Sequence, residues 1–311
     1  MQQTMDIREI AIVSGKGGTG KTSLAACFAA LSSNAVFADC DVDAADLALL
    51  LKARRLSSEL FAASKKARVD DSKCVLCGRC AEVCRYLAIE IREGSLNIDD
   101  FSCEGCRACY YSCPVAAITM ESVVSGEWYL SDSPYGPLVH GRLSPGEENS
   151  GKLVTLVRNR ARDLAQEQGR DLVIIDGPPG IGCPVIASIS GVRLALVVTE
   201  PSLSGLHDME RVLDVIRHFG AVPAVCINRY DLHLDTSEII ERRCDSLGIP
   251  VLGRIPYDRA VVDALVQGIP VVEYSGAGVT GTIREIWERM CQMLRGGRGS
   301  DQSNHAGALT R

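Results

Sequence analysis

A glycine-rich loop between an apolar run and a helical segment is the feature that most limits how this chain folds. Residues 15–22 read GKGGTGKT, directly after the apolar run 9–14 and directly before the helical spacing of 21–32. The pattern GxxxxGK[ST] in this setting is a phosphate-binding loop, whose glycines let backbone N–H groups point at phosphate oxygens. A bare glycine turn is the alternative, and the strand, loop and helix together disfavour it. We expect Lys21 to neutralise the terminal phosphates and Thr22 to offer its hydroxyl to Mg²⁺.

The rest of the chain alternates in the way that βαβ units do. Short runs rich in Val and Ile are predicted to be strands buried on both faces, at 9–14, 35–39, 171–176, 194–200, 224–228 and 250–256. Segments with helical spacing lie between most of them, at 21–32, 152–168, 205–219 and 236–247. The predicted fold class is therefore α/β, a P-loop NTPase domain with a parallel sheet.

Two cysteine runs interrupt this alternation. Each run has the spacing CxxCxxCxxxC, and the second run ends in Pro114 whereas the first is followed by Arg85. This is the pattern of two-cluster bacterial ferredoxins, in which the fourth cysteine of each run ligates the other 4Fe-4S cluster. One cluster is therefore assigned Cys74, Cys77, Cys80 and Cys113, and the other Cys84, Cys103, Cys106 and Cys109. Zinc is the competing metal, but zinc ribbons use two CxxC pairs and not this spacing twice over.

The domain organisation follows from this interruption. We predict a discontinuous ATPase domain at 1–65 and 123–295, with a small inserted α+β domain of bacterial-ferredoxin type at 66–122. A stretch rich in Gly, Pro, Ser and Tyr (125–151) precedes the next helical segment. The polar, small-residue tail 296–311 is predicted to be disordered.

Composition excludes several classes of protein. The chain has 311 residues, 46% of them hydrophobic, with a formal net charge of −6 and a pI near 5.5. The sign of this charge disfavours non-specific binding to nucleic acid or to an anionic membrane. There is no signal-peptide pattern and no apolar run of membrane-spanning length, so a cytoplasmic location is expected. Fourteen cysteines in such a chain favour metal binding over disulfides.

The loop carries an unusual lysine, Lys16, directly after its first glycine. The resulting pattern KGGxGK[ST] resembles the deviant Walker A loop of the MinD, ParA, Mrp and nitrogenase iron protein superfamily. The nucleotide-binding domain is also similar to the cobyrinic acid a,c-diamide synthase-like type, although no span remains for the glutaminase domain that such an amidase needs. The resemblance implies that Lys16 reaches across an ATP-dependent homodimer to the partner's nucleotide. The alternative is that Lys16 is a solvent-exposed loop lysine with no role in nucleotide binding.

The resemblance assigns further residues to the nucleotide site. The segment 39–46, DCDVDAAD, is similar to the family's first switch, in which Asp41 would orient or deprotonate the attacking water, with Asp39 and Asp43 as neighbouring candidates and helix capping as the alternative. The stretch VIIDGPPG (173–180) resembles the Walker B strand and second switch, in which Asp176 would hold Mg²⁺ through water. INRYD (227–231) resembles the adenine-contacting stretch. The implied catalytic residues are Lys16, Lys21 and Asp41, and the nucleotide-binding set is Gly15, Gly17, Gly18, Thr19, Gly20, Lys21, Thr22, Ser23, Asp176, Asn228 and Pro256.

The remaining cysteines are assigned mainly to packing. Cys183 lies seven residues after Asp176, where the nitrogenase iron protein has a cluster ligand, but this offset alone is weak support. The other five occupy apolar positions or lie beside acidic ones, and we expect them to pack in the protein interior: Cys27, Cys40, Cys226, Cys244 and Cys291.

Three functions fit these features. The favoured hypothesis is an ATPase whose nucleotide state gates electron transfer through two 4Fe-4S clusters, with an unknown redox or client protein as partner. The second is an iron–sulfur carrier or scaffold similar to the Mrp-type ATPases. The third is a MinD- or ParA-like positioning ATPase with redox sensing, which for membrane cycling needs an amphipathic terminal helix. The segment 283–295 has some apolar periodicity, but we expect it to pack on the sheet.

Overall fold

The computed structural model describes residues 6–145, 147, 150–274 and 278–296. The described residues form two compact units, one within residues 6–58, 128–142 and 150–296 and the other within 59–127 and 143–147. Both cysteine runs lie in the second unit. The tail predicted at 296–311 lies outside the described residues from position 297 onward.

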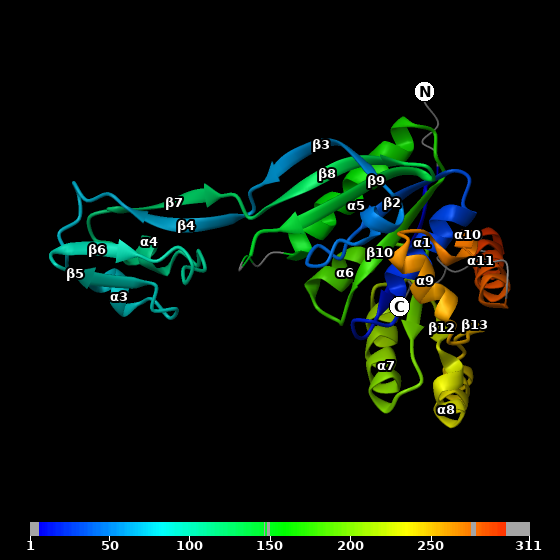
Figure 1. The fold of residues 1–311 in the computed structure, drawn as a ribbon. Helices are drawn as coiled ribbons and strands as arrows, with labels where there is room; N and C mark the ends of the chain where they lie inside the picture. Colours follow the sequence, from blue (N-terminus) through cyan, green and yellow to red (C-terminus); the bar gives the residue numbers. More distant parts are fainter. Residues whose placement is uncertain (1–5, 146, 148–149, 275–277, 297–311) are drawn as a thin grey trace, which may run out of the picture. The chain divides into compact units, whose positions relative to one another are not determined.

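A nine-stranded sheet forms the centre of the first unit (Figure 1). The six predicted strands are confirmed, and they form one uninterrupted parallel block in this sheet. In spatial order the nine strands are β13 (Val251–Ile255), β12 (Val222–Asn228), β11 (Leu194–Thr199), β1 (Arg8–Ser14), β10 (Leu172–Pro179), β2 (Ala35–Asp39), β9 (Gly136–Leu143), β8 (Gly126–Ser133) and β3 (Arg54–Phe61).

Helices cover both faces of the parallel block, which explains why its strands are continuously apolar. On one face, α1, α10 and α11 pack together, and the Phe28 ring stacks on Trp287 with ring centroids 5.4 Å apart. On the other face, α5, α6 and α7 pack in sequence against β2, β10, β1, β11 and β12. The helices of this unit are α1 (Lys21–Leu31), α2 (Leu47–Leu50), α5 (Ser150–Glu167), α6 (Cys183–Ile189), α7 (Leu203–His218), α8 (Leu234–Ser246), α9 (Arg259–Val266), α10 (Val271–Tyr274) and α11 (Gly278–Gly296), with a 3₁₀ turn at Tyr230–Leu232.

The predicted terminal helix at 283–295 lies within α11. Its apolar side chains Ile283, Ile286 and Met290 are at most 2% exposed, because they pack on the sheet and on α1. The prediction that this segment packs in the core is confirmed. Its apolar face is therefore already covered in this fold.

The sequence analysis assigned no strand to 125–151, and here the structure differs. This stretch contains β8 and β9, joined by the short connection at Pro134 and Tyr135, and β9 pairs parallel with β2. The glycines and the proline hide a strand pattern in which Trp128, Leu138 and Val139 are buried. Composition suggested a loop because short strands with Gly, Pro and Ser show little apolar periodicity.

The second unit is built on two small antiparallel pairs. β4 (Ser64–Val69) pairs with β7 (Ile118–Val123), and β5 (Ile89–Arg92) pairs with β6 (Ser95–Ile98). Two short helices, α3 (Arg79–Glu82) and α4 (Ala108–Ser112), each begin between the second and third cysteines of a run. The predicted interval 66–122 lies wholly within this unit, whose own bounds are wider because β4 and β7 extend beyond the cysteines.

The two cysteine runs have the same backbone path. Left-handed residues recur 29 residues apart, as the cysteines do, at the pairs Leu76 and Gly105, Gly78 and Arg107, and Leu87 and Ala116. Gly105 is required at its position, since a Cβ there would lie 1.9 Å from the carbonyl oxygen of Lys65. The repeat seen in the sequence is thus a structural repeat as well.

Candidate nucleotide site and cysteine-lined cavities

The glycine loop joins β1 to α1 at the carboxyl edge of the parallel block. Gly18 and Gly20 have φ values of 78° and 94°, in the left-handed region that favours glycine. Gly15 is fixed by close packing instead, because a Cβ there would lie 2.3 Å from the Cβ of Asp208. Lys21 is the first residue of α1, so the helix N-terminus and the lysine charge are both at the loop, as anion binding requires.

Three buried oxygen atoms beside this loop have no hydrogen-bond partner among the described residues. They are Oγ1 of Thr19 and both carboxylate oxygens of Asp176, whose side chain is fully buried at the carboxyl end of β10. Burial raises the pKa of Asp176 to about 7, while the neighbouring Thr22 hydroxyl, which makes no hydrogen bond of ordinary geometry with the carboxylate, and the Lys21 charge act in the opposite direction. Unpaired oxygens next to a helix-terminal Thr22 are the donor set that Mg²⁺ prefers. These residues therefore fit a magnesium–nucleotide complex.

The predicted first-switch carboxylates have different environments. Asp39 is fully buried, and its oxygens accept hydrogen bonds from the backbone N–H groups of Asp41 (3.2 Å) and Leu47 (3.1 Å). Burial and the Asp176 charge raise the pKa of Asp39. Asp39 therefore holds the loop that carries Asp41, and Asp43 is exposed.

Asp41 itself lies near the charge of Lys21 and is half-buried. Burial raises the pKa of Asp41, although the Lys21 ammonium opposes this shift. Of the predicted acidic candidates, Asp41 is the one that combines proximity to Lys21 with access to solvent. Asp46 begins α2, but its side chain makes no capping hydrogen bond.

The unusual lysine contacts its own chain. The Lys16 ammonium forms an ion pair with Glu200, which directly follows β11, and lies 3.3 Å from Ser202 Oγ and 3.4 Å from Ser204 Oγ. Arg229 Nη1 lies 3.7 Å from the other Glu200 oxygen. The sequence analysis did not identify Glu200, Ser202 or Arg229. These residues follow the carboxyl ends of β11 and β12, and ligands of α/β sheets bind at such ends. This position in the sequence could have identified them as candidate site residues.

A cavity adjoins the loop and is lined by Gly20, Ser23, Asn228 and Pro256 among others. Asn228 donates from Nδ2 to the Thr19 carbonyl (2.8 Å) and accepts from the Arg229 backbone N–H (3.0 Å), so it ties β12 to the loop. Asp231 accepts from the Tyr257 backbone N–H (2.7 Å) and does not line the cavity. The mainly apolar walls and the Asn228 amide suit a nucleotide base.

The eight cysteines line two separate cavities in the second unit, each with about 320 Å³ of empty volume. In each cavity, three cysteines come from one run and the fourth is the last cysteine of the other run. The first cavity is lined by Cys74, Cys77, Cys80 and Cys113, and the second by Cys84, Cys103, Cys106 and Cys109. Apart from these cysteines both cavities are lined mainly by apolar residues, with Arg79 at the first and Tyr86, Glu104 and Arg107 at the second.

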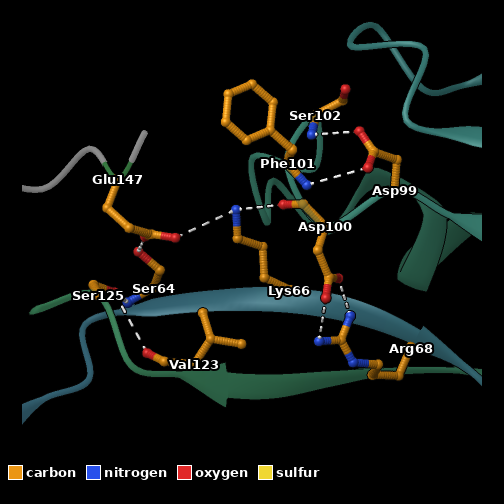
Figure 2. A network of polar contacts seen from close by, with 10 residues as sticks. All are labelled: Ser64, Lys66, Arg68, Asp99, Asp100, Phe101, Ser102, Val123, Ser125 and Glu147. Atoms are coloured by element: carbon orange, nitrogen blue, oxygen red, sulfur yellow. Dashed lines mark hydrogen bonds and ion pairs between the residues drawn. The ribbon is translucent and has the colours of Figure 1, made fainter. Parts of the chain in front are cut away.

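Equivalent aspartates hold the start of each run. The Asp70 carbonyl accepts from the Cys74 N–H (3.1 Å), and the Asp99 carbonyl accepts from the Cys103 N–H (3.0 Å). Figure 2 shows that β4 fixes the second of these turns, because Lys66 donates to the Asp100 carbonyl (2.8 Å) and the Arg68 guanidinium binds the Asp100 carboxylate. These backbone bonds therefore position the first cysteine of each run.

The donor set was tested against two kinds of metal group. Within the described ranges, no three His, Cys, Asp or Glu side chains converge closely enough to hold a single metal ion. A tetrahedral zinc site needs its thiolates within about 2.3 Å of one ion, whereas a four-iron cluster separates them around a larger body. Four thiols taken from both runs around each cavity match the ligand set of a four-iron cluster.

Cysteines outside the two runs mostly pack in the core. Cys27, Cys40, Cys226 and Cys244 are at most 1% exposed, and Cys291 is half-buried. The packing role predicted for these five residues is confirmed. Cys183 is exposed at the start of α6, where its Cβ would lie 3.2 Å from a Cβ added at Gly151.

Comparisons with known proteins identify the family of the nucleotide-binding domain. Residues 10–271 match the CobQ/CobB/MinD/ParA nucleotide binding domain. An uncharacterized protein of Methanocaldococcus jannaschii is 32% identical over 296 residues, covering 93% of this chain and 98% of its own length. The iron-sulfur cluster carrier protein of Pyrococcus abyssi is 25% identical over 167 residues, covering 49% of this chain and 56% of its own length.

Among solved structures, the septum site-determining protein MinD of Pyrococcus horikoshii, complexed with Mg-ADP, is similar with a TM-score of 0.55 and 20% identity. The alignment covers 93% of this chain and 98% of that protein. At this identity the likeness establishes the fold. No helix in the described part of the chain has the length and apolarity to cross a membrane.

Proposed function

The chain belongs to the CobQ/CobB/MinD/ParA nucleotide-binding family, and from this premise we propose that it is an ATP-hydrolysing iron–sulfur protein. Two copies pair when ATP binds, and the nucleotide state gates electron transfer through two 4Fe-4S clusters. One observation supports this proposal above all. The same chain has a phosphate-binding loop beside unpaired buried oxygens and two cavities that are each lined by four cysteines.

In the nucleotide site, the proposal gives each residue a role. The loop N–H groups and Lys21 bind the phosphates, while Thr22 and Asp176 hold Mg²⁺. Asp41 orients the attacking water, and its raised pKa suits a group that accepts a proton during phosphoryl transfer. Asn228 and Pro256 border the base, and Lys16 reaches the phosphates of the second copy, as in a deviant Walker A loop.

In the second unit, the eight cysteines would hold the clusters in the crossed arrangement. When bound, the two clusters supply one-electron carriers. Asp70 and Asp99 keep the first cysteine of each run in place through the backbone bonds described above. An arginine lines each cavity, Arg79 the first and Arg107 the second, and only the second cavity also has a carboxylate, Glu104, in its lining.

The test is a redox titration of the anaerobically prepared protein, followed by EPR, with and without a non-hydrolysable ATP analogue. If nucleotide binding and reduction are coupled, the midpoint moves by about 59 mV for each tenfold difference in nucleotide affinity between redox states. The Lys21→Ala variant is the control, since it should bind the analogue poorly and show no shift. An equal midpoint with and without the analogue in the native sequence would reject gating.

A second function is favoured by one observation. The Pyrococcus abyssi relative is named an iron-sulfur cluster carrier, and Cys77 and Cys106 are exposed at the two cavities. A carrier would transfer iron and sulfide to an apo-acceptor protein at a rate that ATP changes. Clusters that stay in the chain during incubation with the acceptor would eliminate this function and leave electron transfer.

A further inference from the structure

Glu200 connects the unusual lysine to the wall of the base cavity. One of its oxygens pairs with Lys16, and the other lies 3.7 Å from Nη1 of Arg229. Arg229 also lines the cavity next to Asn228. A single carboxylate therefore binds two cations that come from different strand ends.

The three side chains are partly shielded from water. Their exposed fractions are 24% for Glu200, 31% for Lys16 and 40% for Arg229. Ser202 and Ser204 add two hydroxyl contacts to the Lys16 ammonium. In this conformation Lys16 is engaged within its own chain, and the proposed contact with a partner's phosphates requires it to leave Glu200.

Removing one partner of a shielded ion pair is unfavourable, because the remaining charge loses its compensation. Here the second cation reduces that cost. Arg229 is held nearby through its backbone, which donates to Asn228 Oδ1 and adopts a left-handed φ of 54°. Its guanidinium can neutralise Glu200 after Lys16 departs.

We propose that Glu200 is a positioning residue that keeps Lys16 on its own chain until the phosphates of a second copy bind it, and that Arg229 is the replacement counter-ion. This inference rests on the proposed ATP-dependent pairing. Under this proposal, the equilibrium between monomer and dimer depends on the Glu200 carboxylate, although Glu200 does not bind the nucleotide phosphates itself.

Two variants should move this balance in opposite directions. Glu200→Gln removes the competing anion, so ATP-dependent association should occur at an ATP concentration about two- to fivefold lower, the range of a partly exposed ion pair. Arg229→Gln leaves Glu200 uncompensated after Lys16 departs, so association should need more ATP than in the native sequence. The double variant should behave as Glu200→Gln does.

Association is measured by light scattering of the full chain over a range of ATP concentrations, and ADP affinity is measured for each variant to correct for changes in nucleotide binding. Glu210→Gln is the matched control, because Glu210 on α7 pairs with Arg243 on α8 and takes no part in the ion pairs described for Glu200. Shifts of the Glu200 and Arg229 variants in the same direction would overturn the proposal.

A second measurement separates this inference from the proposed function. Labelling of Lys16 by an amine-reactive reagent, mapped by mass spectrometry without nucleotide, should be faster in Glu200→Gln than in the native sequence and in Glu200→Asp. Equal labelling in all three would overturn the Glu200 contact. If the native chain does not associate with ATP at all, pairing fails, and the labelling still decides whether Glu200 holds Lys16.

Discussion

At the residue scale, the nucleotide site consists of polar groups that the fold leaves without partners. Asp176 is buried with both oxygens unpaired, and Thr19 Oγ1 shares this condition. Such groups cost free energy in the nucleotide-free protein, about 1 to 3 kcal/mol for each unsatisfied atom. A ligand that supplies positive charge and hydrogen-bond donors removes this cost. The unsatisfied oxygens therefore explain both the loss of stability and the proposed magnesium binding.

The Asp176→Asn variant tests this link. We expect ATP hydrolysis to fall at least about 100-fold, because the variant lacks the charge that holds Mg²⁺ against the phosphates. The urea midpoint without nucleotide should not fall, since a buried unpaired carboxylate is replaced by a neutral group of the same shape. Asp245→Asn, at an exposed position on α8, is the control for hydrolysis. Normal hydrolysis by Asp176→Asn would contradict the assignment.

At the element scale, strands β8 and β9 hold a half-buried histidine. His140 on β9 lies 3.0 Å from Ser131 Oγ on β8, and its ring is 4.9 Å from that of Tyr129. Burial lowers the pKa of His140 from 6.5 to about 4, and the Arg55 charge acts in the same direction. The folded state therefore keeps this imidazole neutral at pH values where the unfolded chain protonates it.

Stability should depend on pH through His140. Between pH 6.5 and 4 the unfolded state binds the extra proton, so the free energy of unfolding falls as the pH is lowered, by about 2 kcal/mol from this residue. Urea unfolding at several pH values over this range gives the free energy of unfolding as a function of pH. This free energy should change less with pH in His140→Asn than in the exposed control His207→Asn. Identical slopes for the two variants would refute the prediction.

The two cysteine runs are the second element-scale case, because each cavity needs both of them. Under the crossed arrangement, Cys80→Ala with Cys113→Ala damages one cavity and should retain about half of the iron. Cys80→Ala with Cys84→Ala damages both cavities and should retain little iron. Iron analysis and EPR of anaerobically purified protein measure this, with Cys244→Ala as the packing control. The reverse order of iron contents would show that each run holds its own cluster.

At the scale of the whole molecule, function is proposed to require two copies. The Lys16→Ala variant should bind ATP almost as the native chain does, because Lys21 and the loop remain. Its ATP-dependent association and its hydrolysis should both decrease, hydrolysis by about 10-fold or more. Light scattering and phosphate release check this, with Lys52→Ala, an exposed lysine beyond α2, as the control. Native rates of hydrolysis in Lys16→Ala would reject the paired state.

The sequence alone was sufficient for the parallel block and the glycine loop. Both are local patterns, since strands buried on two faces are continuously apolar and a left-handed turn needs glycines such as Gly18 and Gly20. The cysteine spacing repeats after 29 residues, so it predicts a duplicated unit. Strands β8 and β9 were missed because their burial depends on distant partners, β2 among them, and leaves little trace in their own composition.

Tertiary structure alone decided which groups meet. Lys16 and Arg229 are far from Glu200 in the sequence. Only the order of β1, β11 and β12 in the sheet brings both cations to the Glu200 carboxylate. The grouping of Cys113 with Cys74 is different, because the spacing of the two runs predicted it and the cavity lining agrees with it. Local patterns determine turns, helices and strands, whereas the pairing of these charges depends on packing between segments that the sequence separates.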